Sequence, residues 1–172
     1  MRTPQSHGWA VVAFAVAVTG ILFGWWMSLP PGPVPADAPP TEFSAERAFV
    51  HTQMLAQRKH PAGSRENDKV CAYIHDQLKS MGVETVLVNR PARTGSRSMA
   101  MWRAVLGRIR GTAPTKAVAM DAHFDSVPYG PGAADDLAGV VAMLETARAL
   151  KASPPLKNDV IFVFADQEEF NM

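Results

Sequence analysis

Residues 116–165 read KAVAMDAHFDSVPYGPGAADDLAGVVAMLETARALKASPPLKNDVIFVFA, and the order of elements within them sets the fold class. The near-continuous apolar run Lys116–Ala122 predicts a buried strand. Asp136–Lys151 predicts a helix and Val160–Ala165 a second apolar strand. One face of that helix would carry Leu137, Val140, Val141, Leu144 and Ala147. A strand–helix–strand order predicts a βαβ unit, and therefore an α/β fold whose sheet is covered on both faces.

The segment before this unit also alternates between helix and strand. A helix over Ser44–Gln57 has Ser44 in position to cap its first turn. A second helix ends at Gly82, a residue that suits the turn after a helix. In order, the expected elements are helix Ser44–Gln57, helix Ser64–Met81, strand Val83–Asn89, a polar turn over Pro91–Ser98 and strand Met99–Ile109.

The N-terminal region predicts a membrane anchor. Trp9–Leu29 contains no charged residue, and its 21 residues would extend about 30 Å as a helix, the thickness of a bilayer core. Trp9 and Trp25–Trp26 stand near its two ends, where indoles favour the membrane interface. A cleaved secretory signal and a buried core helix are the alternatives.

The flanking charges predict how this anchor is oriented. Arg2 precedes the span, and no basic residue follows it until Arg47. The positive-inside rule then places residues 1–8 in the cytoplasm and the rest in the periplasm or a lumen, as a single-pass protein. Six of the 14 prolines fall between residues 30 and 40, so residues 30–43 are expected to form a semi-rigid stalk.

Composition excludes several functions. The formal net charge of +1 gives no basic face for nucleic acid. Cys71 is the only cysteine, which excludes an intrachain disulfide and a Cys-rich zinc finger.

Three polar clusters interrupt the apolar elements. His123–Asp125 follows the first strand of the unit, Gly132–Asp136 precedes the helix, and Asp166–Glu169 follows the second strand. Ligand sites of open α/β sheets form at the carboxyl ends of the strands, so the clusters are expected to meet at one rim. One imidazole and several carboxylates suit zinc or another divalent ion. Taken singly, each cluster is ordinary: a surface histidine, a helix cap and a solvated turn.

Order and spacing together favour a catalytic metal site. Asp125 can hold the imidazole of His123 in one tautomer. Glu168 and Glu169 can divide the roles of general base and metal ligand.

The stretch MDAHFDSVPYGPGAADDLAGVVAMLETARAL (120–150), followed by FVFADQEEF (162–170), resembles metallopeptidase family 28. These are co-catalytic di-zinc aminopeptidases of the aminopeptidase S and Y type. LAQRKHPAGSRENDKVCAYIHDQLKSMGV (55–83) is similar to the family's lead-in. The nearest subgroup is the membrane-bound metallopeptidases of vacuole and endoplasmic reticulum, with their bacterial relatives. The resemblance implies a zinc-exopeptidase-like fold: a mixed, largely parallel sheet flanked by helices, preceded here by one transmembrane helix.

The resemblance also implies roles for individual residues. His123 matches a ligand of the first zinc, Asp135 the aspartate that bridges both zincs, and Glu169 a ligand of the second. Asp125 matches the carboxylate that orients the histidine, and Glu168 the general base. Asp135 is followed by Asp136 across a peptide bond that is characteristically cis in the family. The implied substrates are peptide or protein N-termini.

Two departures accompany the resemblance. Gln167 stands where the family usually has glycine or alanine, and Phe170 and Asn171 replace smaller residues. The family's two remaining ligands, an aspartate and a histidine, come later in the chain than Met172. Residues 44–172 are therefore expected to be the N-terminal part of a catalytic domain, incomplete and inactive alone. The alternatives are a non-catalytic membrane-anchored ectodomain and a single-zinc aminoacyl cyclotransferase relative.

Overall fold

The computed structural model describes residues 6–94 and 98–170 and divides them into two units, separated after Gly32. The first unit holds helix α1 (Ser6–Ser28). Its segment Gly8–Ser28 is long and apolar enough to cross a membrane, judged by length and composition. It coincides with the predicted span to within one residue at each end.

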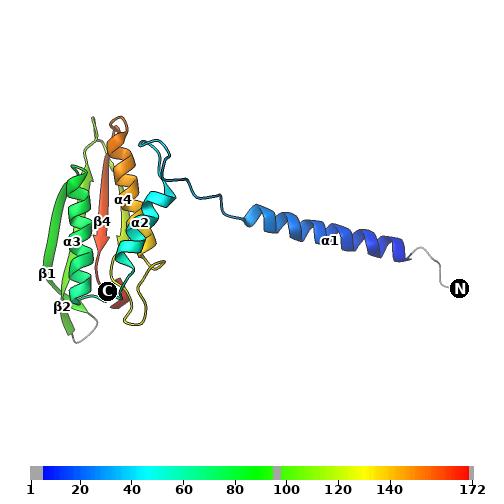
Figure 1. Ribbon diagram of the computed structural model, residues 1–172, viewed down its shortest axis with the longest axis horizontal. Helices are drawn as coiled ribbons and strands as arrows, with labels where there is room; N and C mark the ends of the chain where they lie inside the picture. Colours follow the sequence, from blue (N-terminus) through cyan, green and yellow to red (C-terminus); the bar gives the residue numbers. More distant parts are fainter. Residues whose placement is uncertain (1–5, 95–97, 171–172) are drawn as a thin grey trace. The chain divides into compact units, whose positions relative to one another are not determined.

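The second unit carries the α/β fold (Figure 1). Its sheet has the strand order β1-β2-β4-β3, with β1 and β2 antiparallel, β2 and β4 antiparallel, and β3 and β4 parallel. The elements are α2 (Ala45–Leu55), α3 (Arg65–Ser80), β1 (Glu84–Thr94), β2 (Ser98–Ile109), β3 (Ala117–His123), α4 (Leu137–Ala152), β4 (Asp159–Ala165) and the short 3-10 helix η1 (Glu168–Phe170).

The predicted helix ends are confirmed by their capping contacts. The Ser44 hydroxyl accepts a hydrogen bond from the Arg47 N–H at the start of α2. The hydroxyl of Ser64 does the same for Asn67 in α3. Gly82 follows α3 with φ +69°, a left-handed conformation that glycine adopts at little cost.

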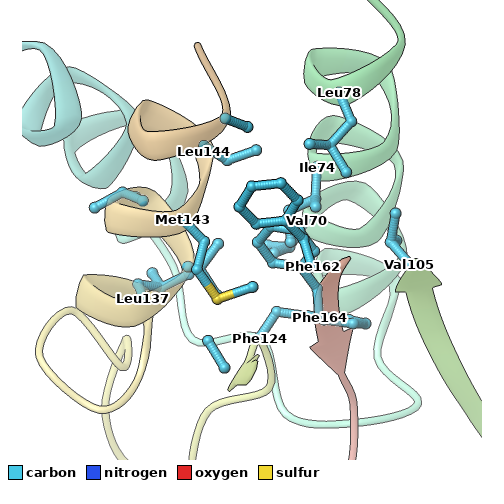
Figure 2. Close-up of a cluster of buried hydrophobic side chains, with 14 of the residues drawn as sticks. Val70, Ile74, Leu78, Val105, Phe124, Leu137, Met143, Leu144, Phe162 and Phe164 are labelled. Carbon is cyan, nitrogen blue, oxygen red and sulfur yellow. The ribbon is translucent and has the colours of Figure 1, made fainter. Parts of the chain in front are cut away.

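The core lies between the sheet and its helices (Figure 2). Phe162 and Phe164 project from β4 between α3 and α4. Ile74 and Leu78 of α3 approach them from one side, and Leu144 of α4 from the other. All five side chains are fully buried. This packing fixes α4 relative to the ends of β3 and β4, where the polar clusters lie.

Three expectations about the sheet are wrong in detail, although the mixed α/β class is confirmed. Helices α3 and α4 pack on the Phe162 face, and among the described residues no helix covers the other face, where Ile161 and Val163 are half-buried. One strand pair of three is parallel, so the described part is not largely parallel. Strand β3 is mostly exposed rather than buried, because it pairs with β4 alone.

The expected polar turn over residues 91–98 is shorter than predicted. Strand β1 continues through Pro91 to Thr94, and β2 begins at Ser98; the remaining residues, 95–97, lie outside the described part. Strand β1 is an edge of the sheet, the place in a sheet where proline, which has no N–H to donate, is found.

Candidate metal centre

The three polar clusters meet at the rim formed by the carboxyl ends of β3 and β4. His123 is the last residue of β3, and Glu168 and Glu169 begin η1 directly after the β4 turn. Asp135 stands two residues before α4, whose first turn is capped by the Asp136 carboxylate accepting from the Gly139 N–H at 3.0 Å. The peptide bond between Asp135 and Asp136 is cis, as the resemblance predicted.

His123, Asp135 and Glu169 could hold a metal ion together. One donor atom from each lies within 4.8 Å of the others. His123 Nε2 is 3.2 Å from Asp135 Oδ1 and 3.8 Å from Glu168 Oε2. The His123 side chain is 10% exposed, whereas that of Asp135 is 83% exposed. An imidazole with two carboxylates is a donor set that suits zinc, so these three residues fit one such ion.

Asp125 links the histidine to the two glutamates. Its side chain is fully buried, and its Oδ1 lies 3.4 Å from His123 Nδ1. The backbone carbonyl of Asp125 is closer to the same nitrogen, at 3.1 Å. The carboxylate also accepts hydrogen bonds from the backbone N–H groups of Glu168 and Glu169. The Oδ1 atom and the backbone carbonyl oxygen of Asp125 both face Nδ1. They therefore fix Nδ1 as the protonated nitrogen and leave Nε2 free for a metal.

The electrostatics of the site favour a bound cation. Burial would lower the pKa of His123, but the charges of Asp125 and Glu168 and the hydrogen bonds to Asp135 and Asp125 outweigh it and raise that pKa. Partial burial and the neighbouring charge of Asp135 raise the pKa of Glu169. Carboxylates crowded around one imidazole contribute to both shifts, and a divalent cation between them would relieve the repulsion.

A buried turn, Asp166–Gln167, connects β4 to the two glutamates. Asp166 N–H donates to the Arg103 carbonyl at 3.1 Å, and Gln167 Nε2 donates to the Met101 carbonyl at 2.7 Å. The Arg103 guanidinium lies 3.6 Å from Asp166 and also pairs with Asp68 of α3. Gln167 has φ +74°, a conformation for which glycine is the usual residue. Glycine, one of the two residues that the family usually has here, adopts this conformation without strain. In this chain the side-chain hydrogen bond to the Met101 carbonyl holds a glutamine in it.

Residues 104–172 match the model of Peptidase family M28. This segment, which holds all five predicted site residues, is of peptidase family M28. The resemblance drawn from the histidine, paired-aspartate and paired-glutamate motifs is therefore confirmed.

The chain is also similar to curated proteins whose names place them in the vacuolar membrane or the endoplasmic reticulum. A vacuolar membrane protease of Eremothecium gossypii is 29% identical over 145 residues, which cover 73% of this chain and 14% of the relative. Endoplasmic reticulum metallopeptidase 1 of Rattus norvegicus is 33% identical over 149 residues, covering 74% of this chain and 16% of the relative. The chain thus spans a small fraction of the length of these relatives.

Solved structures share the fold. A glutaminyl cyclase of Porphyromonas gingivalis superimposes with a TM-score of 0.68 at 26% identity, over 76% of this chain and 48% of the cyclase. A Zn-dependent exopeptidase of Parabacteroides distasonis superimposes with a TM-score of 0.66 at 21% identity, over 76% of this chain and 49% of the exopeptidase. The zinc-exopeptidase-like fold is thereby confirmed.

All five predicted site residues lie at this rim. His123, Asp135 and Glu169 come together as a donor set, while Asp125 and Glu168 adjoin it. Sequence reasoning did not predict the contribution of Arg103, because a basic residue within a strand carries no local sign of a partner about 60 positions away. The positive φ of Gln167 could have been expected from the resemblance, because the family usually has glycine or alanine at that position.

Proposed function

We propose that this chain contributes to a membrane-anchored zinc-dependent aminopeptidase that hydrolyses N-terminal peptide bonds through a di-zinc site. The observation that carries the proposal is the convergence of His123, Asp135 and Glu169 donor atoms within 4.8 Å, beside Glu168. The match of residues 104–172 to a peptidase family supports hydrolysis as the reaction class.

His123, Asp135 and Glu169 would hold the metal in this site. Zinc bound there would act as a Lewis acid on the scissile carbonyl and make an attacking water more acidic. Asp125 keeps the Nδ1 proton of His123 in place, so that Nε2 presents a lone pair to the site.

Glu168 is the residue that would move the proton. Its carboxylate is 64% exposed and points toward the rim, 3.8 Å from His123 Nε2. It would take a proton from the attacking water and deliver it to the amine that leaves as the peptide bond breaks. Its backbone N–H is held by Asp125, so the base is positioned by the same group that orients the histidine.

A single-zinc aminoacyl cyclotransferase is the second candidate. The likeness to the Porphyromonas gingivalis glutaminyl cyclase favours it, since 26% identity accompanies the shared fold. A non-catalytic ectodomain of the same fold is the third. The zinc content of the purified full-length protein separates them, because the three candidates predict two ions per chain, one, and none.

The test of the proposed reaction is Glu168→Gln in the full-length, zinc-loaded protein. Turnover of an aminoacyl anilide should fall by roughly 10²–10⁴-fold while zinc content stays unchanged, because general-base catalysis contributes about that factor. His123→Ala should instead lose zinc. Unchanged turnover in Glu168→Gln would show that Glu168 is not the base. Release of ammonia from an N-terminal glutaminyl peptide, without anilide hydrolysis, would favour the cyclase.

We also propose that α1 anchors the protein as a single span, with its N-terminus in the cytoplasm and the M28 unit in the periplasm or a lumen. The charge-free length of α1 and the names of the relatives support the anchor. Arg2 before the span, with no basic residue after it until Arg47, supports the orientation.

A further inference from the structure

The Pro-rich segment Val34–Glu42, here called the strap, is attached to the folded unit. Its carbonyl oxygens are bound by two arginines of different helices. Arg47 of α2 donates to the carbonyls of Ala36, Ala38 and Glu42 at 2.6, 2.9 and 2.7 Å. Arg148 of α4 donates to those of Pro40 and Glu42 at 2.7 and 2.8 Å.

Both arginines are held in place by one buried carboxylate. Glu145 of α4 is completely buried. Its Oε1 accepts from Arg47 Nε at 3.0 Å, and its Oε2 accepts from Arg148 Nε at 2.6 Å. The Ser44 N–H donates to the same carboxylate at 2.9 Å. Burial alone would raise the pKa of Glu145, but hydrogen bonds from Arg148, Ser44 and Arg47 together lower it.

The strap uses a mode of attachment that suits its composition. Prolines have no N–H, so a Pro-rich segment offers carbonyl acceptors without the donors that a sheet or helix needs. Guanidinium groups supply several donors each in a fixed plane, and can therefore bind successive carbonyls along an extended chain. The Ser44 hydroxyl adds contacts to the Val34 and Pro35 carbonyls, at 3.0 and 2.8 Å.

We propose that the Arg47–Glu145–Arg148 cluster keeps the strap permanently docked, so that Leu29–Pro33 is the only mobile connection between α1 and the M28 unit. Five residues reach at most about 17 Å. A free stalk over the 14 residues 30–43 would reach about 43 Å. This short tether restricts the substrates to N-termini presented close to the bilayer surface. That inference rests on the proposed membrane anchoring and peptidase activity.

Hydrogen exchange tests the docking without any activity assay. Three strap amides donate hydrogen bonds in the docked form: Ala36 to the Glu46 carboxylate, Ala38 to the Pro35 carbonyl and Glu42 to the Pro39 carbonyl. In the full-length protein these amides should exchange at least tenfold more slowly than in a free peptide of the same sequence. Glu145→Gln should remove most of that protection, whereas the backbone amides of β4 should stay protected. Arg148→Lys is a milder variant, since lysine retains the charge and three donors but lacks the planar guanidinium that spans Glu145 and the two carbonyls.

Glu66→Gln is the matched control, because it breaks an exposed helical pair with Lys69 three residues away. Its strap protection should equal that of the wild type. Free-peptide exchange in the wild type, or unchanged protection in both Glu145→Gln and Arg148→Lys, would overturn the proposal.

Energy transfer in proteoliposomes tests the reach. A donor on the M28 unit and acceptor lipids should give high transfer in the wild type. Transfer should fall when 14 Gly/Ser residues are inserted between Gly32 and Pro33, and fall partway in Glu145→Gln. Equal transfer in the wild type and the insertion variant would show that the tether does not set the reach.

The substrate claim has a separate readout. A peptide anchored by an acyl chain should be cleaved at least tenfold faster with a short spacer than with a rigid polyproline spacer about 40 Å long, the length at which a free stalk would still reach. The insertion variant should abolish this difference, and an equal rate with both spacers in the wild type would contradict it. If no peptide is cleaved at all, the peptidase proposal fails while the exchange and transfer results still decide the docking.

Discussion

Oδ1 of Asp125 accepts a hydrogen bond from the backbone N–H of Glu168 at 3.2 Å. Oδ2 does the same for the N–H of Glu169 at 3.3 Å. The carboxylate that faces His123 therefore also sets the backbone of the proposed base and of a proposed ligand. A single buried side chain connects the ends of β3 and β4 across the site.

Asp125→Asn should weaken zinc binding by about 10–100-fold, the usual cost of losing a group that orients a metal ligand. The amide can accept from one of the two N–H groups but presents its own NH₂ to the other, so η1 shifts. Competition with a chromogenic chelator measures the affinity. Asp121→Asn is the control, since this exposed carboxylate lies only two residues from His123. Equal affinity in wild type and Asp125→Asn would contradict the orienting role.

Asp166→Asn should change the pH dependence of stability. Burial, followed by the charge of Asp125, raises the pKa of Asp166 to about 7, against the opposing effect of Arg103. A folded pKa above the ordinary value of 3.8 means that the folded state holds the proton more tightly. The stabilisation from that proton is complete below the unfolded pKa and is lost as pH rises through the folded one.

Urea unfolding of the metal-free protein at pH 5, 6, 7 and 8 measures this effect. The stability of Asp166→Asn relative to the wild type should rise across the series, because asparagine does not titrate. A constant difference at every pH would mean that Asp166 keeps its charge throughout.

Gln167→Gly should be more stable than Gln167→Ala by about 1 kcal/mol, because an L residue in the left-handed region costs about 1–2 kcal/mol and glycine avoids it. Both changes remove the hydrogen bond to the Met101 carbonyl, so their difference isolates the backbone contribution. Chemical denaturation of the two variants provides the comparison. Equal midpoints would place the stabilising role of Gln167 in its side chain alone.

Local periodicity was sufficient to predict the βαβ unit. The spacing of apolar residues over 137–147 predicts a helix, and the continuous apolar run 160–165 predicts a strand. The meeting of His123 with Glu168 followed from a general rule, since parallel neighbours end at the same edge of a sheet. The individual roles of these residues came from the family resemblance rather than from spacing.

The sequence did not show which face of the sheet is covered. Strand β4 is apolar on both faces, so Phe162 and Ile161 look equally suited to a core, and only tertiary packing distinguishes them. The docking of the Pro-rich segment was not predictable for a related reason. Arg47 and Glu145 are separated by 98 positions, and no local pattern pairs side chains at that distance.

The cap of α4 ties the metal chemistry to the register of a helix. Asp135 directly precedes the capping residue Asp136, and eight residues of α4 are buried. One residue inserted or deleted early in this helix would rotate its start by about 100° relative to the packed remainder. Asp135 would then leave the rim, although no donor had been substituted. Evolution can therefore alter the surrounding loops in length, whereas the first turns of α4 must keep theirs.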